Sequence, residues 1–158
     1  MADWLIEPFD LSQWCERMLA CRDFASEHDC DVFLAGLAEA ERNMNGEIAT
    51  TLLDMFSDTD DFGVLERARN VLEAADRHVF YPALVAGLAG LLERSPDKQW
   101  AMTLLGIEVE HGDLPLLLDY IRRAPSPQRC VAMAFIRSDG FLSEYPQALA
   151  FSKGVGAY

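Results

Sequence analysis

Apolar residues recur every three or four positions along almost the whole chain, which is the spacing of one face of an α-helix. No stretch alternates apolar and polar residues for long enough to predict a strand. In the first half of the chain, this spacing predicts helices over 11–22, 30–44, 47–57 and 62–76. Polar residues that can cap three of these helices lie at or just before their starts, namely Asp10 or Ser12, Asp29 or Asp31, and the run 57–61.

The second half of the chain continues the helical spacing. Its predicted helices cover 79–94, 97–111, 113–123, 127–138 and, as a last short helix, 143–152. Pro96 and Pro115 fit the first turns of their helices, where the missing N–H costs nothing, and Trp100 and Leu104 are expected to face inward. Seven to nine helices joined by short loops predict an all-α fold, with one helical domain over 1–158.

An internal repeat connects two parts of this second half. Tyr81-Pro82-Ala83-Leu84 is similar to Leu114-Pro115-Leu116-Leu117 at an offset of 33 residues. Arg94-Ser95-Pro96 followed by Trp100-Ala101 is similar to Pro125-Ser126-Pro127 followed by Val131-Ala132 at an offset of 31. This pattern resembles HEAT-type repeats, whose units are pairs of antiparallel helices. The resemblance implies two stacked HEAT-like hairpins within 79–138, next to an acidic and less regular helical part within 1–76.

The net charge of −13 is concentrated in the N-terminal part of the chain. Residues 1–61 contain 15 Asp and Glu against 3 Lys and Arg, whereas residues 62–158 contain 11 against 10. A field of this sign repels nucleic acid and anionic membranes and attracts basic proteins. Acidity that serves only solubility is the alternative, but solubility does not require the charge to cluster. We therefore expect a protein partner that is basic, and neither nucleic acid nor membrane.

Three acidic clusters are candidates for the surface that meets this partner. For each, the structural alternative is that acids favour helix starts and solvated turns. The run that contains Asp60 is the hardest to explain in that way, since one acid suffices for a cap. An aromatic residue such as Tyr81 would anchor the interface beside the acids. The clusters are Asp58, Asp60 and Asp61; Glu108, Glu110 and Asp113; and Glu27, Asp29 and Asp31.

Known catalytic and metal-binding patterns are not found in the sequence. There is no nucleophile elbow around a serine and no glycine-rich phosphate loop. His111 beside Glu108 and Glu110 is an alternative acid–base or metal cluster, although a histidine near a helix C-terminus is also stabilised by the helix dipole. Zinc ligand types occur without the spacing of a standard zinc site, at Cys15, Cys21, His28 and Cys30. We expect no catalytic activity and no cofactor.

The compartment is indicated by the cysteines and by the apolar segments. A chain of 158 residues can form a core without disulfides, so the four cysteines are expected to be reduced thiols, with Cys130 on a helix that packs inward. The start of the chain has no basic stretch followed by an apolar run. The longest uncharged stretch, 79–92, has 14 residues and is too short to span a bilayer. We expect a cytoplasmic protein.

Small size, acidity, a helical repeat and the lack of catalytic motifs together resemble the immunity proteins of bacterial polymorphic and contact-dependent toxin systems. The resemblance implies a tight complex with a cognate toxin domain, such as a basic nuclease, whose phosphate-binding groove the carboxylates would occupy. A helical-repeat adaptor or assembly chaperone without a toxin partner is the second hypothesis. An enzyme built around His111 is the third.

Overall fold

The computed structural model describes residues 8–59 and 61–152, and these residues form ten α-helices and no strand. The all-α class is therefore confirmed. Eight of the helices are 9 to 18 residues long, and two short ones follow near the C-terminal end. None of the helices in this part of the chain is long and apolar enough to cross a membrane. The helices are α1 (Leu11–Ala20), α2 (Glu27–Asn43), α3 (Gly46–Asp54), α4 (Val64–Ala74), α5 (Arg77–Arg94), α6 (Gln99–Glu110), α7 (Leu114–Arg123), α8 (Ser126–Ile136), α9 (Asp139–Glu144) and α10 (Ala148–Ser152).

The helix starts are set by side-chain caps, not always the predicted ones. Asp10 caps α1 as expected, because its carboxylate accepts a hydrogen bond from the Gln13 N–H. The cap of α2 is Ser26, whereas Asp29 or Asp31 was predicted, so this helix begins three residues early. The single helix predicted over 143–152 is two helices, α9 and α10, with Pro146 in the break between them.

The prolines of the two repeat copies occupy different places in their helices. Pro115 lies in the first turn of α7, as predicted. Pro82 lies inside α5, because Asp76 caps that helix and starts it earlier. Pro96 was predicted to open α6, but it lies in the preceding turn, and α6 begins only after Lys98, whose φ is +64°. The HEAT-like pairing of these helices therefore stays a prediction.

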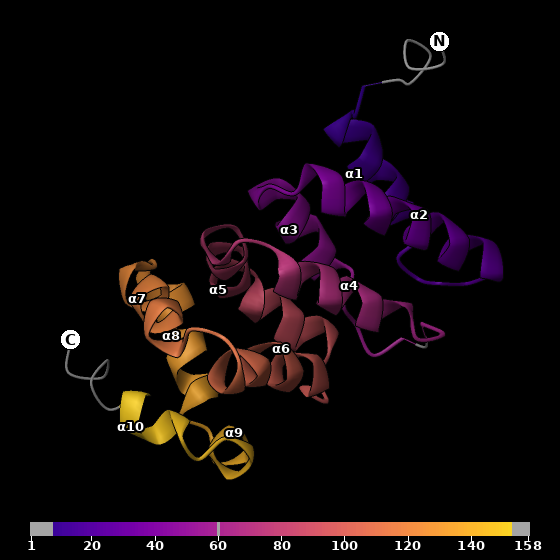
Figure 1. Cartoon of the computed structure of the whole chain (residues 1–158). Helices are drawn as coiled ribbons and strands as arrows, with labels where there is room; N and C mark the ends of the chain where they lie inside the picture. The colour runs from indigo at the N-terminus through magenta and orange to yellow at the C-terminus, as the bar shows by residue number, and fades with distance from the viewer. Residues whose placement is uncertain (1–7, 60, 153–158) are drawn as a thin grey trace.

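Helix α5 is the central helix of the fold (Figure 1). Its most extensive contacts are with α3 and α8, and it also contacts α6 and α7. The last residue of α5, Arg94, closes the end of α3 by donating hydrogen bonds to the carbonyl oxygens of Leu53 at 2.9 Å and Phe56 at 3.1 Å. Consecutive helices from α5 to α8 contact one another, as the predicted hairpins require.

Buried apolar side chains from α1 through α10 form one continuous cluster. Leu104 belongs to it with 1% of its surface exposed, as predicted. Trp100 was also predicted to lie in the core, but it is only partly buried and packs at the edge. Leu19 on α1 is a large apolar residue, yet it is 38% exposed. The spacing therefore identifies the buried face of each helix, but not how far the neighbouring helices cover it.

Candidate partner-binding surface

The first three helices and their loops carry acidic side chains that project into solvent. Two of the acids here are neutralised: Glu39 lies 2.6 Å from Arg17, and Asp54 lies 3.8 Å from Arg94. Six others are exposed and make no side-chain hydrogen bond or ion pair with any described residue, namely Glu16, Asp23, Glu27, Asp31, Glu41 and Glu47. Exposed acids without nearby counter-charges produce a negative field that attracts basic proteins.

The loop between α3 and α4 is held in place by one of its predicted binding residues. The Asp58 carboxylate accepts hydrogen bonds from the Ser95 hydroxyl and, at 3.4 Å, from the Asp97 N–H. The hydrogen bond from Ser95 is the main cause that lowers the pKa of Asp58 below its ordinary value. Asp58 is exposed, so it contributes to the acidic surface and also joins this loop to the turn between α5 and α6.

The other described acid of this run, Asp61, caps α4. Its carboxylate accepts hydrogen bonds from the N–H groups of Gly63 at 3.3 Å and Leu65 at 2.7 Å. Gly63 itself has a φ of +83°, a conformation that glycine adopts without strain, and it has no side chain to offer as a cap. Asp60 lies outside the described residues. The run is thus not simply a set of excess acids, because Asp58 and Asp61 both have structural partners.

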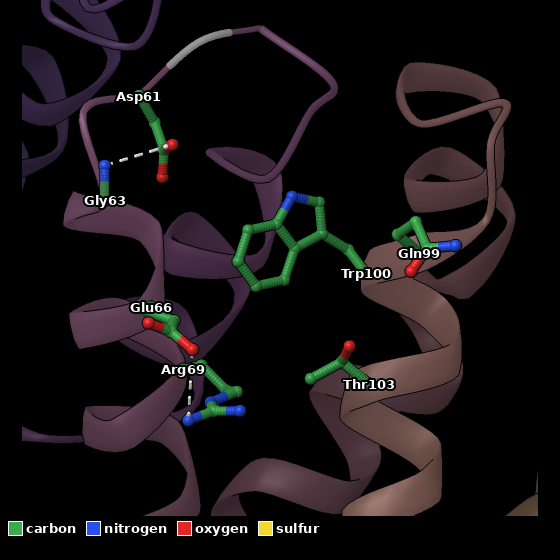
Figure 2. A pocket seen from close by; sticks show the side chains of 7 residues that line it. All are labelled: Asp61, Gly63, Glu66, Arg69, Gln99, Trp100 and Thr103. Atoms are coloured by element: carbon green, nitrogen blue, oxygen red, sulfur yellow. Dashed lines mark hydrogen bonds and ion pairs between the residues drawn. The ribbon is translucent and has the colours of Figure 1, made fainter.

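A pocket of about 330 Å³ lies beside this loop, between α4 and α6 (Figure 2). The indole of Trp100 projects from α6 toward α4, and its N–H donates at 3.0 Å to the carbonyl oxygen of Ser57 in the α3–α4 loop. The indole also packs edge to face with Phe56, at 4.8 Å between ring centroids. On the opposite wall, Glu66 and Arg69 form a loose ion pair of 3.7 Å. The pocket is lined by Asp61, Gly63, Glu66, Arg69, Gln99, Trp100 and Thr103.

Two further predicted binding residues, Tyr81 and Glu108, meet inside the protein. The Tyr81 hydroxyl donates a hydrogen bond to Glu108 Oε2 and accepts one from the Asp113 N–H at 3.0 Å. Tyr81 is 0% exposed and Glu108 is 5% exposed. Burial, followed by the hydrogen bond to Glu108, raises the pKa of Tyr81 to about 12, so its hydroxyl remains a donor at neutral pH. Burial likewise raises the pKa of Glu108, and Gly112 leaves room for its carboxylate, which a Cβ there would overlap.

The prediction that Tyr81 and Glu108 contact a partner must therefore be corrected, because both side chains are enclosed. Asp113 is half-buried and caps α7 by accepting a hydrogen bond from the Leu116 N–H at 3.1 Å. Only Glu110 of this acidic cluster is exposed, 3.8 Å from His111. The sequence places the three acids around one turn, but it does not show that α6 directs Glu108 inward.

The residues considered for catalysis or metal binding are dispersed. Glu108 is bonded to Tyr81, whereas His111 pairs with Glu110, so the predicted cluster around His111 is divided. Within the described ranges, no three His, Cys, Asp or Glu side chains come together in a way that could hold a metal ion. The four cysteines are free thiols, and Cys130 is exposed, contrary to the inward packing expected for it.

Two features of this surface were missed in the sequence. Trp100 was expected in the core, and its place on the pocket wall depends on Ser57, 43 residues earlier. Ser95 is 1% exposed and donates a hydrogen bond to Asp58, although the sequence indicated it only as part of the internal repeat. Comparisons of the chain with protein-family models, with curated proteins and with solved structures found no match.

Proposed function

We propose that this protein binds a basic protein partner through the acidic surface of its N-terminal helices. We further propose that it is a cytoplasmic immunity protein, which neutralises a cognate bacterial toxin domain by forming a tight complex with it. The observation that carries this proposal is the set of exposed acids on α1 to α3 and their loops that form no ion pair with a described residue. No catalytic role enters the proposal.

The chemistry of such a surface suits the inhibition of a nuclease. Carboxylates that enter a groove built for phosphates replace the charge of the nucleic acid and exclude it. Complementary charge also speeds association, most strongly at low salt. Phe62, which is 67% exposed beside the acids of the α3–α4 loop, adds an apolar contact of the kind that anchors interfaces.

The test is to purify the tagged full chain from the cells that produce it and to identify the bound protein by mass spectrometry. We expect a basic partner whose association rate falls as the salt concentration rises. The partner is then expressed alone and together with this chain. Growth inhibition that co-expression relieves would support neutralisation of a toxin, whereas a basic but harmless partner would favour the adaptor or chaperone. An acidic partner would remove the electrostatic basis of the proposal.

A further inference from the structure

The pocket between α4 and α6 combines an aromatic wall with several side chains that can accept hydrogen bonds. Trp100 forms the aromatic wall, held by its hydrogen bond to Ser57 and its contact with Phe56. Facing it are the carboxylates of Asp61 and Glu66 (Figure 2). Gln99 and Thr103 add an amide oxygen and a hydroxyl to the same lining.

The carboxylates of this pocket retain capacity to accept more hydrogen bonds. Asp61 accepts two backbone N–H groups, whereas an ionised carboxylate offers about four acceptor positions. Glu66 is held only by its 3.7 Å ion pair with Arg69, and 66% of its side chain is exposed. A volume of about 330 Å³ is at the small end of ligand pockets and suits one side chain better than a large ligand.

A guanidinium group matches this lining better than other side chains. It is planar, carries five N–H donors and no acceptor, and stacks on aromatic rings while it pairs with carboxylates. A lysine ammonium is a compact, strongly hydrated charge that does not stack. We propose that the pocket receives an arginine side chain of the protein partner, with its guanidinium against the Trp100 ring and paired with Glu66 and Asp61. This inference rests on the proposed binding of a basic protein and names the place where one of its residues is recognised.

Arg69 is a cation already present in the pocket wall, and its charge should affect how the pocket binds a second guanidinium. Its Nε is buried without a hydrogen-bond partner among the described residues, and its charge lies 3.7 Å from Glu66. A second guanidinium in the pocket would compete with Arg69 for Glu66 and be repelled by it. Removal of Arg69 should therefore tighten arginine binding, whereas removal of Glu66 should weaken it.

The experiment uses the full chain and N-acetyl-arginine amide as the probe. The matched ligand is N-acetyl-citrulline amide, in which a neutral urea replaces the guanidinium. Binding is followed by NMR through the indole N–H signal of Trp100, which is assigned by its loss in Trp100→Phe. We expect the arginine probe to shift this signal at concentrations where the citrulline and lysine analogues do not. Glu66→Gln should weaken binding by up to about 5-fold, which is the worth of an exposed ion pair.

Glu144→Gln is the control for Glu66→Gln, because Glu144 is also an exposed glutamate on a helix, but it lies on α9 and does not line the pocket. It changes the net charge equally and should leave binding of the probe unchanged. Arg69→Gln should strengthen binding, with the exposed Arg67→Gln on the same helix as its control. Three outcomes would overturn the arginine pocket: equal binding of the citrulline or lysine analogue, equal effects of Glu66→Gln and Glu144→Gln, or no shift of the Trp100 signal at all. The proposed function would stand if a basic partner still co-purified, and it would fail separately if the partner were acidic.

Discussion

Tyr81 on α5 and Glu108 on α6 are joined inside the protein, where the Tyr81 hydroxyl donates a hydrogen bond to the Glu108 carboxylate. The same hydroxyl accepts the Asp113 N–H that precedes α7, so one side chain connects three consecutive helices. Glu108 requires such a donor because a buried carboxylate is costly to leave without one. The pair therefore joins helices within the core, although the sequence predicted that both residues bind the partner.

Replacing Tyr81 with Phe should destabilise the protein without changing the shape of the core. The variant keeps the ring but leaves Glu108 without its donor and the Asp113 N–H without its acceptor. A loss of roughly 1–3 kcal/mol in the free energy of unfolding is expected, as for a buried polar group left unsatisfied. Urea unfolding followed by circular dichroism measures this. A loss below about half a kcal/mol would mean that water or a shifted side chain replaces the hydroxyl.

The pH dependence of stability should reveal the raised pKa of Glu108. Burial raises this pKa above its ordinary value of 4.5 in the folded protein. The folded state then holds the proton more tightly than the unfolded state, so the contribution of Glu108 is most favourable below pH 4.5 and is lost as the pH rises through the folded-state pKa. Glu108→Gln cannot titrate, so its stability relative to the wild type should increase over this interval. A stability difference that does not change with pH would contradict the raised pKa.

Ser95→Ala should loosen the connection between the α3–α4 loop and the α5–α6 turn. The hydrogen bond from Ser95 is the main cause of the lowered pKa of Asp58, so this pKa should move back up toward 3.8 in the variant. The lowered pKa contributes stability that is present above pH 3.8 and is lost as the pH falls through the folded-state value. The variant should therefore be less stable at neutral pH and lose less on acidification. Carboxyl NMR titration of Asp58 and thermal unfolding at two pH values test this, with the exposed Ser143→Ala as the control.

Leu104→Ala tests the inward face of α6. Leu104 is 1% exposed, so its truncation should cost about 2–5 kcal/mol through lost burial and the cavity left behind. Truncation of the half-buried Met102 on the same helix should cost less. Denaturant unfolding of both variants compares them directly, and equal losses would show that the two side chains are equally enclosed.

The acidic surface is tested with variants that keep the structural acids intact. Asp58 and Asp61 are unsuitable because their replacement also removes a loop contact or a helix cap. Glu16, Glu41 and Glu47 are exposed, and their triple replacement with Gln should slow association with a basic partner by about 2- to 10-fold at low salt. The difference should shrink at high salt, where the field is screened.

The control for this variant is the triple replacement with Gln of the exposed acids Glu93, Glu110 and Glu144. Both triple variants change the net charge by the same amount, but only the first removes charge from α1 to α3. Association rates are compared by stopped-flow fluorescence once the partner is identified. Equal slowing by both variants would show that only the total charge matters, and not the N-terminal surface.

The helices were largely predictable, because each depends on spacing and caps within a few residues of one another. The apolar spacing places all eight longer helices close to their observed positions, and Asp10 caps α1 as predicted. The errors at helix ends are also local: Ser26 competes with Asp29 for the cap of α2, and Lys98 delays the start of α6. Small free-energy differences decide at which residue a helix begins, and the spacing of apolar residues does not reveal these differences.

The candidate site was less predictable, because its important contacts join distant parts of the chain. Ser95 reaches Asp58 across 37 residues, and Tyr81 reaches Glu108 across 27. Spacing along one helix does not show which polar side chain a neighbouring helix will enclose. For this reason, Glu108 and Glu110 look equivalent in the sequence, although one is buried and the other exposed.

Arg94 has a consequence for how the chain can be divided. It lies at the end of α5, yet it closes the end of α3 by binding the carbonyl oxygens of Leu53 and Phe56. The acidic and the nearly neutral parts of the sequence are therefore not separate halves of the fold. A fragment that ended after α4 would lack Arg94, so those carbonyl oxygens would have no donor. The fragment would regain the donor only by binding the remainder of the chain.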